Sequence, residues 1–494
     1  MLITNEELKK LLLKNDLLDE TSFADVSQYA KSFDLSLIET LIEKNIISDS
    51  LLSELLAKSL KLPFISLSKV SIPEKVFRLI PERIAKKYKI IAFAYEKDSI
   101  KVGMADPKNE ELIEMLAKKT GKKILPHLAS VSDIERTFQI YKKDLQLAFN
   151  ELLKSREGET PVSTIVDMLV AYAIQDSASD IHIEPQEKNI LIRFRLDGIL
   201  HNKLNLPKNL HDQIVSRIKV MAKLQTDDHI NPQDGKLRYE FEHVYIDIRV
   251  SIINTVDGEK VVLRLLPARS RLFSMSDLGI NARDLKKLSK VLDKSFGMVL
   301  ATGPTGSGKT TTIYSILKML NDSEKNVTTI EDPVEYKIKG INQIQIKSSI
   351  NFTFAKGLRS VLRQDPDIIF VGEIRDIETA NIAVNAALTG HVVLSTLHTN
   401  DAATALLRLI DMKVEPFLVA STVNVIIAQR LIRKICDHCK KPLIFQRKKL
   451  STDINNQLIN KYFGRYPKIT TYKGDGCKMC SFTGYSGRIG FFEV

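Results

Sequence analysis

The sequence predicts a multidomain α/β protein, and three observations lead to this fold class. The chain has 494 residues, which is more than one hydrophobic core usually supports. Its composition, with 44% hydrophobic and 27% charged residues, is that of a globular protein. From about residue 275, apolar strands alternate with helices, which is the pattern of a parallel sheet covered by helices. The longest apolar run, "FLVASTVNVIIAQRLI", is interrupted by polar residues and predicts a buried helix, not a membrane span.

The first part of the chain, residues 1–140, is predicted to form an N-terminal domain with two parts. Residues 1–60 are rich in Leu at helical spacing, which indicates a helical part. Residues 61–140 combine short strands with helices, including a helix, a turn at Gly121 and a strand, and are predicted to be an α/β part. Residues 141–161 become polar and charged toward their end and are predicted to be a linker.

Two further domains are predicted after this linker. Residues 162–274 begin with a helix and continue with alternating strands, and two Asp-Gly pairs, at 197–198 and 257–258, mark turns between strands. Residues 275–494 contain the strands and helices of the parallel sheet. A segment at about 433–485 carries all four cysteines and is predicted to be an insertion in this last domain.

The stretch "MVLATGPTGSGKTTTIYSILKML" contains the nucleotide-binding pattern G-x-x-x-x-G-K-T between a predicted strand and a predicted helix. Backbone N–H groups of such a loop wrap a phosphate at the N-terminus of the following helix. Lys309 is expected to reach the β- and γ-phosphates of ATP, and Thr310 to give a hydroxyl to Mg²⁺. The predicted nucleotide-binding residues are Gly303, Pro304, Thr305, Gly306, Ser307, Gly308, Lys309, Thr310 and Thr311.

Acidic residues follow two apolar strands downstream of this loop. "VTTIEDPVEY" ends a strand at Glu331 and Asp332, with Glu335 shortly after, and "DIIFVGEIRD" ends the next strand at Glu373. Because ligands bind at the carboxyl ends of strands in parallel α/β sheets, we expect these acids to face the phosphates. Glu373 is predicted to lie beside Mg²⁺, and Gly372 to leave room for the metal and its waters.

Histidines occur in two places that need separate interpretation. "HVVLSTLHTND" brings His391 to the start of a third strand and His398 just past its end, where His398 can sense or polarise the γ-phosphate. Asp180, His182 and Glu184 alternate along another strand and resemble a metal triad. The same alternation is found on any exposed strand face and no further ligand is near in sequence, so we interpret these three as surface residues.

The four cysteines form two C-x-x-C pairs, "CDHC" and "CKMC". Two such pairs separated by a loop are typical of a Zn²⁺ ion held by four thiolates, and a reducing cytosol disfavours disulfides. A redox dithiol or a chance pairing is the alternative. The predicted zinc ligands are Cys436, Cys439, Cys477 and Cys480.

Charge and the N-terminus set limits on location and partners. The net charge of +12 admits a nucleic acid or an acidic membrane, but the lysines are spread singly, which favours a solvated surface. The N-terminus "MLITNEELKK" lacks the basic and apolar regions of a signal peptide. We therefore expect a cytoplasmic protein that reaches a membrane only through a partner.

Together, "GPTGSGKT", "IEDPVE", "LRQDPDIIFVGEIRD", "TGHVVLSTLHTNDA" and the paired cysteines resemble the secretion ATPase superfamily, most closely the assembly ATPases of type IV pili and type II secretion systems. The resemblance covers nearly the whole chain and is stronger from about residue 160. It implies a RecA-like P-loop ATPase core in 275–494, a PAS-like α/β middle domain in 162–274, a helical plus α/β N-terminal domain in 1–140 and a tetracysteine zinc insertion. Retraction motors of the superfamily lack the cysteine pairs and the long N-terminal region, so an extension motor is expected.

The resemblance also implies residue roles and an assembly. Glu373 would be the atypical Walker B acid, Glu335 the general base that activates water, and His391 and His398 the His-box pair. The family forms hexameric rings, in which the middle domain of one subunit completes the nucleotide site of its neighbour. Arginines of that middle domain reach the phosphates in trans, and the matching residues are Arg249 in "IDIRVS" and Arg264 in "VVLRLLP".

A function follows from the same resemblance. The ring would hydrolyse ATP to power the assembly of type IV pili or type II secretion pseudopili, acting through an inner-membrane platform protein at the inner face of the cell membrane. The chain departs from the family in two places. Some relatives bind cyclic di-GMP through an R-L-G start and a later Gly, where this chain has Ser36, Ile38 and Asn45, which counts against binding there. The chain also stops at "GRIGFFEV", where family members usually continue with further helices.

Two other functional classes are considered. A ring that translocates nucleic acid, or drives DNA uptake, agrees with the basic charge, but no basic stretch is interleaved with aromatic residues that would stack on bases. No direct nucleic-acid partner is therefore expected. A degraded regulatory subunit is the non-enzymatic alternative, and the presence of Lys309, Glu335 and Glu373 argues against it.

Overall fold

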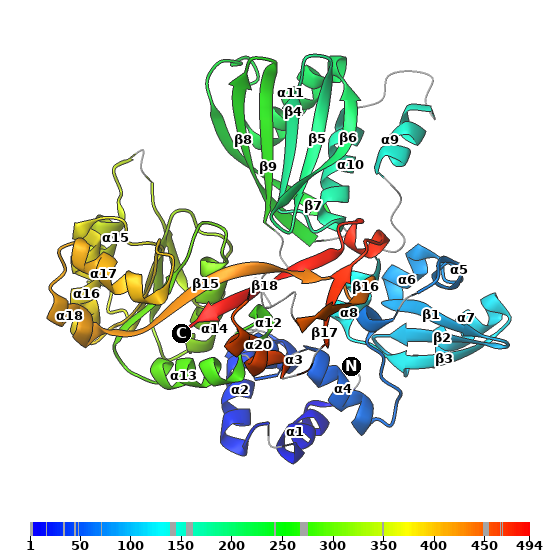
Figure 1. The fold of residues 1–494 in the computed structure, drawn as a ribbon, viewed down its shortest axis with the longest axis horizontal. Coiled ribbons are helices and arrows are strands. Elements are labelled where there is room, and N and C mark those ends of the chain that lie inside the picture. Colours follow the sequence, from blue (N-terminus) through cyan, green and yellow to red (C-terminus); the bar gives the residue numbers. More distant parts are fainter. Residues whose placement is uncertain are drawn as a thin grey trace. The chain divides into compact units, whose positions relative to one another are not determined.

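The computed structural model divides the chain into two compact units (Figure 1). One unit comprises Met1–Leu55, Ala268–Ile432 and Arg488–Val494, and the other comprises Leu56–Pro267 and Arg433–Gly487. The structure describes residues 3–15, 17–32, 35–43, 46–47, 49–70, 72–138, 145–154, 162–241, 244–266, 275–347, 350–447, 454–464, 466 and 468–494. Among the helices of these ranges, none combines the length and the apolar character needed to cross a membrane.

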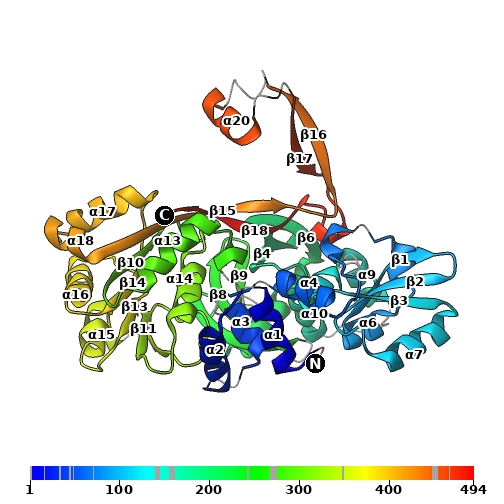
Figure 2. The same cartoon turned by 90° about the horizontal axis from the view of Figure 1, so that it is seen from below.

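A seven-stranded sheet forms the centre of the first unit (Figure 2). Its strands are ordered β12-β11-β13-β14-β10-β15-β18, and the pairs from β12 to β15 are all parallel. Parallel pairing places the carboxyl ends of these strands at one edge of the sheet. The strands are β10 (Gly297–Thr302), β11 (Val327–Glu331), β12 (Asn342–Gln345), β13 (Ile368–Val371), β14 (Val392–Leu397), β15 (Val423–Ile435) and β18 (Tyr485–Glu493).

Helices cover both faces of this sheet, as the sequence predicts. Along β10, Met298 and Leu300 pack into one apolar cluster and Val299 and Ala301 into another, because alternate residues of a strand point to opposite faces. The cluster of Val299 is closed by α12 (Met275–Leu278), α13 (Ala282–Leu292) and α14 (Lys309–Leu320). The cluster of Met298 is closed by α15 (Phe354–Val361), α16 (Ile377–Leu388), α17 (Ala402–Asp411) and α18 (Pro416–Thr422).

The longest apolar run is not the single buried helix that the sequence predicts. Only its first part is helical, in α18, and the chain then enters β15 at Val423. Four of the five residues after Thr422, Val423–Ile427, are Val or Ile, and such β-branched side chains fit a pleated surface better than a helix. Pairing with β10 buries Ile427, Ala428 and Gln429 and leaves the four residues before them half-buried, so the apolar part of the run lies inside a sheet.

The middle domain is a six-stranded antiparallel sheet, ordered β6-β5-β4-β9-β8-β7, with one apolar face packed against helices. The two predicted Asp-Gly turns are confirmed, since they join β5 to β6 and β8 to β9. Inside the predicted linker the structure describes a helix, α9 (Leu145–Lys154), whose Leu145 and Phe149 join the same apolar core. The other elements are α10 (Val162–Gln175), β4 (Asp180–Pro185), β5 (Asn189–Leu196), β6 (Ile199–Pro207), α11 (His211–Ala222), β7 (Gln233–Phe241), β8 (Val244–Thr255) and β9 (Gly258–Leu266).

The N-terminal region has the predicted helical and α/β parts. The helical part comprises α1 (Asn5–Lys14), α2 (Glu20–Ser32), α3 (Leu37–Glu43) and α4 (Asp49–Ser59). In the α/β part Gly121 ends a helix in the left-handed conformation just before a strand, as predicted. Its elements are α5 (Glu74–Phe77), α6 (Glu82–Tyr88), β1 (Ile90–Glu96), β2 (Ser99–Met104), α7 (Glu110–Thr120), β3 (Lys123–Leu128) and α8 (Val131–Thr137).

In the chain, the cysteine-bearing segment follows β15 and precedes β18, the last two strands of the large sheet. It contains a two-stranded antiparallel ribbon and a short helix (Figure 2). Its elements are β16 (Lys440–Gln446), α20 (Asn456–Phe463) and β17 (Lys468–Gly474).

Candidate functional site

The predicted phosphate-binding loop joins the fully buried strand β10 to helix α14. Gly303 and Gly308 have positive φ values of 143° and 91°, which favour glycine. A side chain at either position would also collide with Gln429, since an added Cβ would lie 2.4 Å from its carbonyl oxygen at Gly303 and 2.8 Å from its amide nitrogen at Gly308. The two glycines thus let the loop close over β15.

The loop has the cationic and hydrogen-bonding groups that bind a nucleoside triphosphate. The Lys309 ammonium is buried and donates to the carbonyl oxygens of Gly303 at 2.8 Å and Pro304 at 3.1 Å. Burial lowers the pKa of Lys309, and the charge of Glu373 opposes that shift. The Ser307 hydroxyl is buried without a hydrogen-bond partner in the described part of the chain. A cradle of this shape, with a buried cation and an orphaned hydroxyl, fits the phosphates of ATP.

Glu373 lies two residues past the end of β13, close to this loop. One of its carboxylate oxygens is 2.6 Å from the guanidinium of Arg375, and the other is 3.3 Å from the imidazole Nε2 of His398. Its side chain is 14% exposed, so the carboxylate lies at the rim of the sheet, as the sequence predicts. A rim carboxylate within electrostatic reach of Lys309 can share a divalent cation with the hydroxyl of Thr310.

Position 372 requires a glycine for a different reason from the one predicted. An added Cβ would lie 3.2 Å from the carbonyl oxygen of Ile330 and 3.4 Å from the ring of Phe354. The glycine therefore allows close packing against β11 and α15, rather than leaving room for a metal and its waters. The carbonyl of Gly372 in turn accepts a hydrogen bond from the hydroxyl of Thr396 at 2.7 Å, which fixes the strand end that carries Glu373.

Glu331 does not face the phosphates, contrary to the expectation from its place at a strand end. Its side chain is buried, and its carboxylate accepts hydrogen bonds from the hydroxyls of Thr329 and Tyr314. Burial raises the pKa of Glu331. Glu335, which follows in the same segment, is half-buried, and its backbone N–H donates to the Tyr314 hydroxyl at 3.3 Å.

The two histidines lie at opposite ends of β14. His398 follows the carboxyl end, beside Glu373, as predicted. His391 precedes the other end, where its ring binds the carbonyl of Ala386 at 2.9 Å and its own carbonyl accepts from Gly297 at 3.0 Å. A strand of this length separates its ends by roughly 20 Å. The structure thus places His391 at the start of the strand and His398 past its end, as predicted, and their shared role as a His-box pair stays a prediction.

Three residues near the loop were missed by the sequence reasoning. Gln429 underlies both loop glycines, and its side-chain oxygen accepts from the Thr312 hydroxyl at 2.7 Å. It was missed because the run that contains it predicts a helix. Thr302 and Thr399 exchange a hydroxyl hydrogen bond of 2.6 Å, which ties the end of β10 to the segment after His398. No sequence signal distinguishes these threonines from other buried ones.

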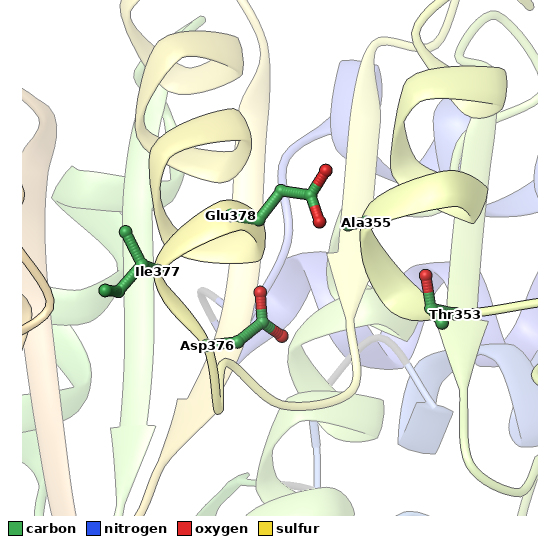
Figure 3. A pocket seen from close by; sticks show the side chains of 5 residues that line it. All are labelled: Thr353, Ala355, Asp376, Ile377 and Glu378. Carbon is green, nitrogen blue, oxygen red and sulfur yellow. The ribbon is translucent and has the colours of Figure 1, made fainter.

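A shallow hollow between the starts of α15 and α16 is not a second phosphate site (Figure 3). Its lining residues are Thr353, Ala355, Asp376, Ile377 and Glu378. Figure 3 shows the carboxylates of Asp376 and Glu378 at the start of α16. Asp376 caps that helix by accepting from Thr379, and Glu378 pairs with Arg359. Carboxylates without a cation in the lining repel an anion.

The two arginines predicted to act in trans are neighbours on the polar face of the middle sheet. Arg249 on β8 pairs in register with Arg264 on β9. The Nε of Arg264 donates to a carboxylate oxygen of Asp180 at 2.9 Å, and Arg195 lies 3.4 Å from the other oxygen. The Arg264 side chain is still 61% exposed. A guanidinium held at one end and open at the other is suited to reach an external anion.

The possible triad of Asp180, His182 and Glu184 is part of a network of ion pairs. Glu184 lies 2.7 Å from Arg193 and 2.8 Å from Lys260. Burial lowers the pKa of His182, so its ring is neutral at pH 7. The expectation that these three are surface residues is wrong for Asp180 and His182, which are buried. The two carboxylates are instead engaged by cationic side chains of neighbouring strands.

The four predicted zinc ligands form one cluster, whose sulfur atoms all lie within 4.8 Å of one another. The Sγ atoms of Cys436 and Cys477 are 3.9 Å apart, and those of Cys477 and Cys480 are 3.8 Å apart. Cys439 and Cys480 are also separated by 3.9 Å between sulfurs. Four thiolates about 2.3 Å from Zn²⁺ form a tetrahedron with edges of about 3.8 Å, so the residues fit this metal. All four cysteines are free of disulfides in the structure.

Backbone N–H groups support the sulfurs. Gly476 donates to the sulfur of Cys439, and both Cys477 and Gly484 donate to the sulfur of Cys480. Burial raises the pKa of the Cys477 thiol to about 11, so a bound cation is needed to hold it as a thiolate at neutral pH.

Two of the residues that replace the cyclic di-GMP pattern, Ser36 and Ile38, lie at the start of α3. Ser36 caps this helix, and its hydroxyl donates to Glu39 at 2.7 Å. Ile38 follows in the first turn. Asn45 lies outside the described residues.

Comparisons with known proteins agree with this geometry. The model of the family described as type II/IV secretion system protein matches residues 155–494, and that of the MshEN domain matches residues 60–146. The type IV pilus assembly ATPase PilB of Myxococcus xanthus is 37% identical over 512 residues, which cover 99% of this chain and 89% of that protein. The type II secretion system protein E of Pectobacterium carotovorum subsp. carotovorum is 44% identical over 364 residues, or 74% of this chain and 71% of that protein.

Solved structures give further likenesses. The structure of the pilus retraction motor PilT with bound ADP is 31% identical, with a TM-score of 0.43, and covers 55% of this chain and 79% of that chain. The structure of the Legionella pneumophila ATPase DotB is 25% identical, with a TM-score of 0.48, and covers 57% of this chain and 79% of that chain. With the family match, the predicted fold class is confirmed: a RecA-like P-loop core, a mixed α/β architecture and a tetracysteine cluster.

The cysteine cluster generates a testable prediction. Metal analysis of protein purified without chelator should find about one Zn²⁺ per chain, because four thiolates close the tetrahedron. Cys436→Ser should lose most of this zinc and make the 433–485 segment more sensitive to limited proteolysis. A matched variant, Ser481→Ala, leaves all four sulfurs in place and should keep the metal. Zinc-free parental protein, or an intramolecular disulfide in its place, would contradict this assignment.

Proposed function

The chain belongs to the type II/IV secretion system protein family, and on this premise we propose that it is a cytoplasmic, hexameric ATPase that powers the assembly of type IV pili or type II secretion pseudopili. ATP hydrolysis follows from the family, in which the relatives carry the names of pilus assembly ATPase and type II secretion protein E. The observation that carries the proposal is the meeting of Lys309, Glu373 and His398 at one edge of a parallel sheet.

The residues of this edge divide the work of hydrolysis. Lys309 and the loop N–H groups would hold the β- and γ-phosphates. Thr310 and Glu373 would hold Mg²⁺, which neutralises charge that develops on the phosphates. Glu335 would accept a proton from the attacking water, and His398, which contacts Glu373, would report the state of the γ-phosphate.

We propose that Arg249 and Arg264 complete the site of a neighbouring subunit. Supporting this, they lie side by side on a polar sheet face, and the ion pair with Asp180 orients Arg264 while most of its side chain stays exposed. A guanidinium placed beside the γ-phosphate stabilises the charge that develops there during transfer. Such an arrangement would make activity depend on assembly of the ring.

The partners are proposed from the relatives. The zinc-bearing segment, 433–485, would present a surface to an inner-membrane platform protein, so that membrane contact is indirect. Cyclic di-GMP is not proposed as a ligand, because Ser36, Ile38 and Asn45 replace the pattern by which some relatives bind it. The MshEN match, at 60–146, lies outside these positions and does not test this departure. A ring ATPase that translocates nucleic acid or drives DNA uptake remains the second candidate, and DNA-stimulated, salt-sensitive ATPase activity would favour it.

The two acids should have separable effects on hydrolysis. Glu335→Gln should lower turnover by roughly 10² to 10⁴ while ATP binding changes little, because a lost base leaves the loop and the metal site intact. Glu373→Gln should also lower turnover but raise the Mg²⁺ concentration needed for half-maximal activity. Both are measured by phosphate release and by titration with a fluorescent ATP analogue. Glu378→Gln, a neighbouring surface acid, is the matched control. Parental turnover of Glu335→Gln would refute the assignment of the base.

The arginines should act across subunits. Arg249→Ala and Arg264→Ala should each lower turnover, although neither lies in the P-loop domain. Mixing either with Lys309→Ala should restore part of the activity, because one mutant brings an intact P-loop and the other intact arginines. Arg238→Ala removes an exposed arginine of the same sheet and serves as the control. Mixed rings, verified by differential tagging, that show no rescue would count against action in trans.

A further inference from the structure

Tyr314 lies at the junction of four segments of the P-loop domain. It is fully buried on α14, five residues after Lys309, and its ring contacts the edges of Tyr336, with centroids 4.7 Å apart, and of Phe370, at 6.3 Å. Its hydroxyl donates to the carboxylate of Glu331 at the end of β11. The hydroxyl therefore joins the helix that begins at the phosphate loop to the strand that leads toward Glu335.

The same hydroxyl also accepts hydrogen bonds. The backbone N–H of Glu335 donates to it at 3.3 Å, and the amide of Gln343 on β12 donates at 3.4 Å. The Gln343 amide also reaches Glu331 at 3.2 Å and the carbonyl of Tyr336 at 3.1 Å. Segment 332–336 is thus held by a polar network that is buried at Tyr314 and Glu331 and half-buried at Glu335 and Gln343.

Burial limits the number of hydrogen-bond arrangements that this network can adopt. Burial raises the pKa values of both Tyr314 and Glu331, with Glu331 adding to the shift of Tyr314, so the phenol keeps its proton and acts as the donor. Because the Tyr314 hydroxyl donates its proton to Glu331, its oxygen accepts the hydrogen bond from the backbone N–H of Glu335. A buried polar group that loses its partner costs far more than an exposed one, so few alternative arrangements compete.

We propose that Tyr314 is a positioning residue for hydrolysis, which fixes the backbone of Glu335 relative to the phosphate loop through its hydroxyl. This inference rests on the proposed role of Glu335 as the base. Lys309 and Tyr314 share one rigid helix, so a phosphate held by the first and a carboxylate placed by the second keep a constant separation. Tyr314 touches neither water nor nucleotide in this role.

Tyr314→Phe tests the proposal because it removes the hydroxyl and keeps the ring and its edge contacts. Turnover should fall about tenfold or more, while the KM for ATP changes by less than about threefold. In the Glu335→Gln background the same substitution should leave the residual turnover unchanged, because the residue acts through Glu335. Deuterium uptake of a peptide covering 332–338 should also increase at early times.

Tyr239→Phe is the matched control, since it removes a partly buried tyrosine hydroxyl of the middle domain, bound to the carbonyl of Asp167 at 3.4 Å. It should alter neither turnover nor uptake of the 332–338 peptide. Gln343→Leu, at the edge of the network, is a second variant. It should also lower turnover, but by a smaller factor than Tyr314→Phe.

Three outcomes would overturn the proposal: parental turnover of Tyr314→Phe, an equal loss in the parental and Glu335→Gln backgrounds, or unchanged deuterium uptake. An equal loss would mean that the hydroxyl supports the fold in general. These outcomes are distinct from a failure of the proposed function, which would show as parental turnover of Glu335→Gln itself.

Discussion

Parallel pairing of β13, β14 and β10 is the constraint on which the nucleotide site depends. The pairing aligns Leu397 with Thr302, so β14 and β10 end at the same level, and it aligns Val371 with Ser395, so β13 ends two residues earlier. Each strand end then delivers its next residues to the same edge, the phosphate loop from β10, Glu373 from β13 and His398 from β14. The ladder of backbone hydrogen bonds sets this alignment, and side-chain hydroxyls such as that of Thr396 only refine it.

The sequence was sufficient to predict this edge because its signals are local. A glycine-rich loop between an apolar strand and a helix, and a glutamate directly after an apolar strand, specify the position of Lys309 and Glu373 along the chain. What the sequence could not show is the direction of each side chain. Glu331 and Glu373 follow similar strands, yet one turns into the core toward Tyr314 and the other stays at the rim.

The errors have physical causes of the same kind. The run that became β15 was interpreted as a helix because a buried strand and a buried helix share a continuous apolar pattern. That choice concealed Gln429, whose position matters only once β15 lies beside β10. The grouping of His391 and His398 as a His-box pair rested on the family resemblance, and the structure places them at opposite ends of β14, as their positions around this strand predict. In contrast, the cysteine spacing predicted its cluster correctly, since all four sulfurs lie within 4.8 Å of one another.

The position of Gln429 under the phosphate loop has a consequence for the synthesis of the protein. Thr312 and Gln429, which hydrogen-bond to each other, are 117 residues apart in the chain. Because the chain is synthesised from its N-terminus, the phosphate-binding loop leaves the ribosome long before the strand β15 that supports it. Until β15 pairs with β10, the loop has only its internal hydrogen bonds, such as those from Lys309 to the carbonyls of Gly303 and Pro304. The support from Gln429 is therefore added only when nearly the whole sheet has been translated.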